Sequence, residues 1–221
     1  MSKKITKNLI KDLSTLEKKI GVKFNNPVLL QEALTHRSYL NENPQSGLTH
    51  NERLEFLGDA VLELIVTENL YNKYPNPEGE LTNWRAALVN AKMLAEIATD
   101  LGLNSHVLLS KGEAKDFGRA RQYILANAFE ALAGAFYLDQ GIEKTKKFII
   151  RWVVSRLAEI LKNNSFRDAK SIFQEEAQER VEITPSYEVL KEWGPDHSKH
   201  FLVGVFLDKG LVAQGEGASK Q

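Results

Sequence analysis

The sequence predicts an all-helical domain followed by a small α+β domain that contains one helix and a three-stranded antiparallel sheet. Apolar residues recur at helical spacing through the first two-thirds of the 221-residue chain, and the spacing becomes strand-like beyond Arg180. A polar Asn-Asn-Ser segment separates the two patterns. We therefore place the first domain at 1–162, a linker at 163–167 and the second domain at 168–221.

The first helices are predicted from apolar periodicity and from residues that start and stop helices. Apolar residues over 5–20 repeat at helical spacing and are followed by Gly21, a residue typical of helix C-caps. Asn26 before Pro27 predicts an N-cap with proline at the first helical position, which opens a helix over 28–34.

The central part of the chain predicts longer helices separated by loops. A helix over 52–72 is ended by Pro75 and Pro77, because proline disfavours helical conformation in the residue before it. A second stretch over 81–101 is stopped by Gly102. The other predicted segments are loops over 41–50 and 111–121 and helices over 123–138 and 142–161.

The second domain is predicted to begin with a helix over 169–180. Three strands follow, over 186–193, where Tyr187, Val189 and Trp193 alternate, over 200–207, which is rich in Phe, Val and Leu, and over the short run 211–217. Gly-Pro-Asp at 194–196 and Asp-Lys-Gly at 208–210 are typical of hairpin turns. The consecutive hairpins predict an antiparallel meander.

Composition excludes several classes of protein. The chain has no Cys, which excludes a disulfide scaffold, a thiolate zinc site, an iron–sulfur centre and a Cys nucleophile. No apolar run approaches the roughly 18 residues of a membrane-spanning helix, so we expect no membrane partner and a cytoplasmic location. The 29 Lys and Arg residues balance the 29 Asp and Glu residues, so net charge gives no indication of a nucleic-acid partner.

Carboxylates recur along one face of the helix predicted over 52–72, at Glu52, Glu55, Asp59 and Glu63. They repel one another at this spacing, and a divalent cation would relieve the repulsion. Oxygen-only ligands suit Mg²⁺ or Mn²⁺. The alternative interpretation is a solvated acidic face. Gly58 costs about 1 kcal/mol relative to Ala inside a helix, which suggests that another helix or a ligand approaches closely beside Asp59.

The helix predicted over 123–138 carries a second polar pair, Asn127 and Glu130, on one face at i and i+3. The side chains around this pair are small: Ala126, Ala128, Ala131, Ala133, Gly134 and Ala135. If this helix crosses the first, four oxygen ligands come together: Glu55, Asp59, Asn127 and Glu130. Alternatively, Asn127 satisfies a buried backbone group.

Residues 50–60 (HNERLEFLGDA) resemble the signature motif of the ribonuclease III family. Residues 33–39 and 80–86 resemble neighbouring blocks of the family, and 124–132 (ILANAFEAL) resemble its second catalytic block. This resemblance covers about 16–161. Residues 168–221 are similar to the double-stranded-RNA-binding domain of the family, with GPDH at 194–197 matching its first hairpin loop and GEGASK at 215–220 matching the approach to its second helix.

The resemblance implies a homodimeric endonuclease that hydrolyses double-stranded RNA with Mg²⁺, for which Mn²⁺ is a possible substitute. The implied products carry 5′-phosphate ends and short 3′ overhangs, and the implied roles are rRNA, mRNA and small-RNA processing. The implied metal contacts are Glu55, Asp59, Asn127 and Glu130. Asp59 and Glu130 are implied to be catalytic, with Glu52 and Glu78 in support. The implied RNA contacts are Gln174, Gln178, His197, Ser219 and Lys220.

Two departures from the family pattern affect these expectations. Asn127 stands where the family has Asp, which keeps an oxygen ligand but removes a charge. Either the site tolerates a neutral ligand, or activity is reduced or abolished. The family's RNA-binding domain continues into a basic helix, whereas this sequence ends at Gln221, so we expect an exposed sheet face and weak duplex binding. Two alternatives therefore accompany the active endonuclease: a catalytically silent double-stranded-RNA-binding protein, and a helical dimerisation protein with a solvated acidic face.

Overall fold

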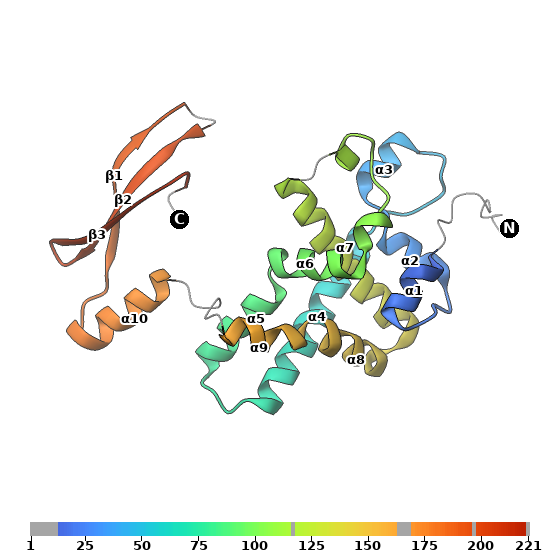
Figure 1. Ribbon diagram of the computed structural model, residues 1–221, viewed down its shortest axis with the longest axis horizontal. Helices are drawn as coiled ribbons and strands as arrows, with labels where there is room; N and C mark the ends of the chain where they lie inside the picture. Colours follow the sequence, from blue (N-terminus) through green and yellow to red (C-terminus); the bar gives the residue numbers. More distant parts are fainter. Residues whose placement is uncertain (1–12, 116–117, 163–168, 196–197, 220–221) are drawn as a thin grey trace. The chain divides into compact units, whose positions relative to one another are not determined.

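The computed structural model describes residues 13–115, 118–162, 169–195 and 198–219. The chain divides into two compact units, Met1–Phe166 and Arg167–Gln221, and the described part of the first is helical while the second contains the strands (Figure 1). The linker predicted at 163–167 lies outside the described residues. Among the described helices, none has the length and apolar character required to cross a membrane.

The described residues of the first unit form helices α1 (Ser14–Ile20), α2 (Pro27–Ala33), α3 (Arg37–Glu42), α4 (Glu52–Lys73), α5 (Glu78–Val89), α6 (Ala91–Leu101), α7 (Arg119–Gln140), α8 (Ile142–Trp152) and α9 (Leu157–Lys162). Short 3₁₀ helices are η1 (Leu103–Ser105), η2 (Glu113–Lys115) and η3 (Val154–Arg156). The two 22-residue helices, α4 and α7, make the most extensive helix–helix contact, and α2, α6 and α8 also pack against α7.

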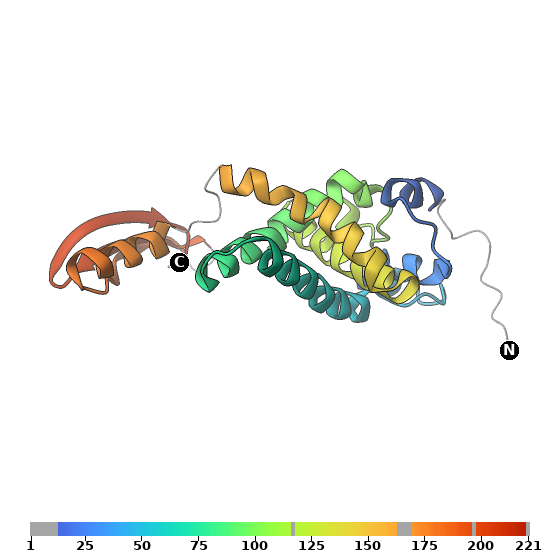
Figure 2. The ribbon, with the colours of Figure 1, turned by 90° about the horizontal axis from the view of Figure 1, so that it is seen from below.

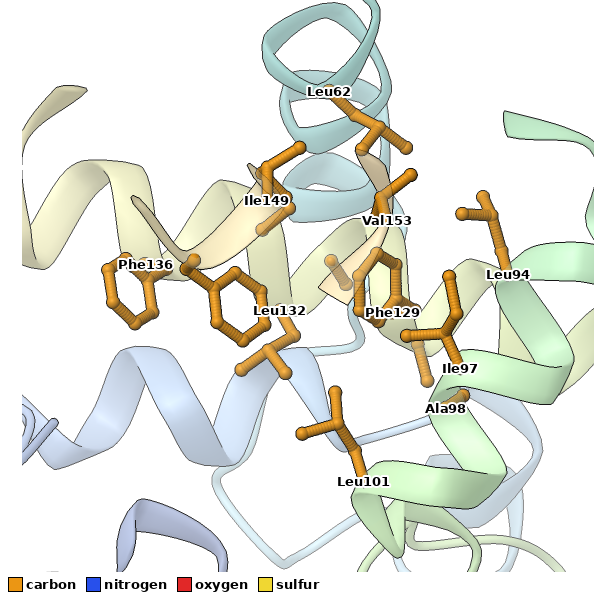
Figure 3. Close-up of a cluster of buried hydrophobic side chains, with 14 of the residues drawn as sticks. Leu62, Leu94, Ile97, Ala98, Leu101, Phe129, Leu132, Phe136, Ile149 and Val153 are labelled. Atoms are coloured by element: carbon orange, nitrogen blue, oxygen red, sulfur yellow. The ribbon is translucent and has the colours of Figure 1, made fainter. Parts of the chain in front are cut away.

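The core of this unit forms where the apolar faces of four helices meet. Figure 3 shows Leu62 of α4, Ile97 of α6, Phe129 of α7 and Ile149 of α8 in one cluster, and all four are buried. Aromatic stacking adds to this packing, because the ring centroids of Phe129 and Phe148 lie 5.9 Å apart. Burial of the apolar face at helical spacing therefore fixes the orientation of both long helices.

Helices α4 and α7 cross at two glycines. A Cβ atom placed on Gly58 would lie 1.7 Å from the carbonyl oxygen of Glu130, and one placed on Gly134 would lie 2.3 Å from the carbonyl oxygen of Leu54. No side chain fits between backbones this close. The expectation that Gly58 marks a close helix approach is confirmed, and the crossing brings Asp59 beside α7.

Most predicted helix starts and stops agree with the structure. The Asn26 side chain accepts a hydrogen bond from the Val28 backbone N–H and begins α2. Gly21 and Gly102 adopt left-handed φ angles of 86° and 78° where α1 and α6 end. The predicted helix over 52–72 is α4, one residue longer.

Two predicted helices are interrupted. The stretch over 81–101 is α5 and α6, because Asn90 leaves the helical conformation with ψ 156° and its side chain caps α6 by accepting from the Met93 N–H. The stretch over 142–161 breaks after Trp152 into α8, η3 and α9. Val153 and Val154 lie at this break, and β-branched residues favour helices less than unbranched ones.

Short elements also lie where the sequence predicted loops or nothing. Helix α3 has six residues and ends at Glu42, inside the loop predicted over 41–50. The loop predicted over 111–121 contains η2 and the first turn of α7. Neither α3 nor η2 contains a buried residue, so hydrophobic periodicity gave no signal for them.

In the second unit, α10 (Ala169–Val181) precedes a sheet of β1 (Ser186–Trp193), β2 (His200–Leu207) and β3 (Gly210–Gly217). The strands pair antiparallel in sequence order, as predicted. Figure 2 shows α10 along one side of the curved sheet, and the Lys170 ammonium lies 4.6 Å from the centre of the Tyr187 ring. Strand residues Val189, Leu190, Leu211 and Val212 remain exposed.

Candidate active site

The ends of the acidic face on α4 are held in ion pairs. Glu52 Oε1 lies 3.3 Å from Nη1 of Arg37 on α3, and Glu63 Oε2 lies 3.7 Å from Nε of Arg85 on α5. Among the residues that the structure describes, no basic side chain pairs with Glu55 or Asp59, which lie between them. The two middle carboxylates are therefore the ones whose charge is not balanced by a basic side chain.

Helix α7 contributes Asn127 to this region. Its side-chain amide donates a hydrogen bond to the Glu55 carboxylate, which favours the ionised form of Glu55. Burial nevertheless raises the pKa of Glu55 above its ordinary value, and repulsion from Glu52 and Asp59 adds to the rise. Asn127 thus supplies an N–H donor that the carboxylate of an Asp residue would lack.

Glu130 lies one helical turn beyond Asn127 on α7. Burial raises its pKa to about 7, with further contributions from repulsion by Asp59 and Glu55. Three carboxylates from two crossing helices therefore repel one another in a partly desolvated region. A bound cation would reverse this effect and hold all three in the ionised form.

The donor set suits a hard divalent cation. Glu55, Asp59 and Glu130 offer carboxylate oxygens and Asn127 offers an amide oxygen, which are the ligand types that Mg²⁺ prefers. Within the described residues, no three His, Cys, Asp or Glu side chains converge closely enough to hold an ion between them. The structure thus gathers these four residues in one region, but their side chains do not form a complete coordination sphere.

Comparison with known proteins identifies the family. Residues 26–157 match the family model described as Ribonuclease-III-like, and residues 169–221 match the double-stranded RNA binding motif. The chain belongs to the ribonuclease III family. The resemblance found at residues 50–60 is therefore confirmed. The chain is an endoribonuclease of this family, with the helical domain preceding the double-stranded-RNA-binding domain as predicted.

Relatives within the ribonuclease III family align with nearly the whole chain. Ribonuclease 3 of Bdellovibrio bacteriovorus is 45% identical over 209 residues, which cover 94% of this chain and 89% of that protein. Ribonuclease 3 of Pelotomaculum thermopropionicum is also 45% identical, over 95% of this chain and 87% of that protein. A solved nuclease domain of ribonuclease III from Campylobacter jejuni is 40% identical with a TM-score of 0.59, covering 65% of this chain and 97% of that one.

Glu78, a supporting acid in the ribonuclease III resemblance, lies apart from the four gathered residues. It begins α5, and its Oε1 accepts a hydrogen bond of 2.9 Å from the Thr82 hydroxyl. It lines a cavity of about 630 Å³ together with Tyr71, Tyr74 and Arg85, and none of the four gathered residues lines that cavity. Within one copy of the chain, Glu78 therefore does not join the carboxylates of α4 and α7.

The ribonuclease III resemblance also named RNA contacts in the second unit. Gln174 is half-buried and Gln178 is exposed on α10, one turn apart, and the Gln178 side chain accepts a hydrogen bond from the Thr184 hydroxyl. Ser219 is exposed beyond β3. His197 and Lys220 lie outside the described residues.

Sequence reasoning missed Arg37 as a neighbour of the site. It lies in the 33–39 block, but no local pattern links it to Glu52, which is fifteen positions away on another helix. The pairing arises from the tertiary fold, so it becomes visible only once α3 and α4 are placed.

Proposed function

We propose that this chain is a Mg²⁺-dependent endonuclease that hydrolyses double-stranded RNA and leaves 5′-phosphate ends with short 3′ overhangs. Mn²⁺ is a possible substitute for Mg²⁺, and rRNA, mRNA and small-RNA precursors in the cytoplasm are the proposed substrates. The gathering of Glu55, Asp59, Asn127 and Glu130 at the crossing of α4 and α7 carries this proposal. Family membership and the double-stranded RNA binding motif support it.

In this proposal the three carboxylates and the Asn127 amide oxygen would hold the ion, with Asp59 and Glu130 most directly tied to activity. When bound, Mg²⁺ lowers the pKa of water and neutralises charge on the phosphate. The protein orients the ligands: the Asn127 amide N–H holds the Glu55 carboxylate, and the helix crossing fixes Asp59 relative to Glu130. Glu52 and Glu78 support RNA engagement and cleavage in this proposal.

The second domain, proposed at 168–221, contacts the duplex outside the cleavage site. Double-stranded RNA is recognised mainly by shape and by 2′-hydroxyl and phosphate contacts, so polar side chains of moderate length suffice. Gln174 and Gln178 on α10 present such groups, and His197, Ser219 and Lys220 complete the proposed contacts. The first domain, at 1–162, supplies the chemistry.

A gel assay with a defined RNA duplex, with and without Mg²⁺, tests the proposal. Cleavage only with Mg²⁺ supports it. Binding without cleavage supports the second candidate, a catalytically silent double-stranded-RNA-binding protein, which Asn127 favours because it removes one charge from the metal site. Absence of both would contradict the proposal.

Asn127→Asp distinguishes an active from an impaired site. The change adds a fourth carboxylate, so we expect tighter Mg²⁺ binding and at least tenfold faster cleavage, which corresponds to about 1.4 kcal/mol of activation barrier. Without metal, the melting temperature should fall, because repulsion replaces the hydrogen bond from Asn127 to Glu55. Cleavage rate and melting temperature measured against Mg²⁺ concentration check both effects. Identical metal dependence in both proteins would remove position 127 from the ligand set.

We propose a homodimer formed through the first domain. Phe56 projects from the signature motif and is 81% exposed, and Leu138 is also exposed. Both side chains line a cavity of about 670 Å³, together with apolar Leu29 and Leu57 and with charged side chains that include Glu52. An exposed aromatic side chain and a cavity with apolar lining residues on the same surface can complement each other across a two-fold axis. The dimer gives one metal site for each RNA strand.

Phe56→Ala should weaken this dimer. Sedimentation equilibrium at micromolar concentration should give a mass near twice 24.9 kDa for the unchanged protein and a mass shifted toward 24.9 kDa for the variant. Tyr71→Ala is the matched control, because Tyr71 is similarly exposed on α4 but lines a different cavity. A purely monomeric unchanged protein would count strongly against the dimer.

A further inference from the structure

We infer that Arg37 contacts an RNA phosphate at the rim of the carboxylate cluster, where Glu52 holds its guanidinium. This inference rests on the proposed endonuclease function and adds a substrate contact in the first domain. It begins from the ion pair between Arg37 and Glu52, which joins α3 to the start of α4.

The position of Arg37 places a cation next to an anionic site. Its Nη1 lies 3.3 Å from Oε1 of Glu52, and Glu52 is close enough to Glu55 to raise the pKa of that carboxyl. An RNA strand that brings a phosphate to the metal site must also bring its neighbouring phosphates past this rim. A cation there would offset the repulsion between those phosphates and the carboxylates.

Backbone contacts fix Arg37 beside α4. The Asn51 N–H donates to the Thr35 carbonyl at 2.9 Å, and Asn51 is buried. On the other side, the His36 N–H donates to the Leu108 carbonyl at 3.1 Å. Arg37 follows immediately after this doubly anchored segment and begins α3. The site therefore holds Arg37 in place before any RNA binds, which lowers the entropic cost of the contact.

Stability alone does not account for the pair. The Arg37 and Glu52 side chains are 68% and 46% exposed, and exposed ion pairs typically contribute only about 0–1 kcal/mol to folding. A guanidinium carries five N–H donors, and a carboxylate oxygen engages only part of this set. The remaining donors face solvent in a fork that matches phosphate geometry. Arg37 can therefore bind a phosphate while Glu52 keeps its orientation.

The test measures binding of the full chain to an RNA duplex by fluorescence anisotropy without divalent metal, over a series of KCl concentrations. Arg37→Ala should weaken binding about five- to tenfold and lower the slope of log K against log salt by roughly 1, as expected for one lost phosphate contact. Arg37→Lys should keep most of the slope because it keeps the charge. Lys147→Ala, an exposed cation on α8, is the control and should bind as the unchanged protein.

The outcomes separate this inference from the function on which it rests. Cleavage by the unchanged protein together with equal affinity and salt slope in Arg37→Ala overturns the contact and leaves the endonuclease intact. An unchanged protein that neither binds nor cleaves duplex overturns both. If Arg37→Ala lowers the melting temperature, Arg37→Gln decides, because it keeps side-chain donors without charge. Binding by Arg37→Gln as tight as that of the unchanged protein overturns the contact, and a matching loss of affinity and slope supports it.

Discussion

Glu130→Gln should slow cleavage of duplex RNA at least a hundredfold while the protein remains folded. The amide has the size of the carboxyl, so the packing of α7 is retained, but it offers the metal no charge. A hundredfold loss corresponds to about 2.7 kcal/mol of activation barrier. Single-turnover cleavage at saturating Mg²⁺, with circular dichroism to verify the fold, checks this result. Unchanged turnover would place the metal site elsewhere.

The same variant isolates a pH effect. Burial and repulsion raise the folded-state pKa of Glu130 to about 7 from an ordinary value of 4.5. The folded protein therefore binds this proton more tightly than the unfolded chain, so metal-free stability falls as pH rises from about 4.5 through 7. The melting temperature of the metal-free protein should be lower at pH 8 than at pH 6. In Glu130→Gln the melting temperature should differ less between these two pH values, because the Glu130 proton no longer contributes. Cleavage at limiting Mg²⁺ should rise over the same window, because protons compete with the metal.

Gly58→Ala should strongly destabilise the first unit. Its Cβ would lie 1.7 Å from a backbone carbonyl oxygen, which cannot rotate away as a side chain could. Overpacking of this kind costs about 3 kcal/mol or more, so the melting temperature should fall by about 10 °C. Cleavage should be lost as well, because the helices that carry Asp59 and Glu130 must separate.

Gly79→Ala is the matched control for this substitution. Gly79 also lies in a helix, α5, but a Cβ there has no heavy atom within 4 Å. Alanine favours helix by about 1 kcal/mol over glycine, so this change should leave stability equal or slightly higher. Calorimetry on both variants compares them. Equal melting temperatures would mean that α4 and α7 can move apart at no cost.

Local signals in the sequence were sufficient for much of the fold. The Asn26-Pro27 cap, the left-handed Gly102 and the hairpin turns each depend on neighbouring residues, so they could be predicted from the sequence. The break at Asn90 could not, because an Asn inside an apolar repeat is compatible with both a continuous helix and a new cap. Helix α3 could not be predicted either, since it contains no buried residue.

The candidate site was only partly visible in the sequence. Gly58 and the small residues on α7 predicted the helix crossing, because helices that pack closely carry small residues where they meet. The separation of Glu78 from the other acids and the pairing of Glu52 with Arg37 depend on contacts between distant segments. No spacing rule reports such contacts. The ligand roles themselves came from the family resemblance and remain proposals.

The glycine crossing has a consequence for motion. Between most packed helices, a layer of side chains can change rotamer and let the helices slide. At Gly58 and Gly134 the two backbones touch directly, so this layer is missing. The proposed metal ligands on α4 can therefore move away from those on α7 only when the core of the first unit opens. Opening of the core is the rarest fluctuation of a folded domain. An RNA duplex therefore meets a fixed pair of helices, and any adjustment on binding must come from exposed side chains around them rather than from a change in the spacing of the carboxylates.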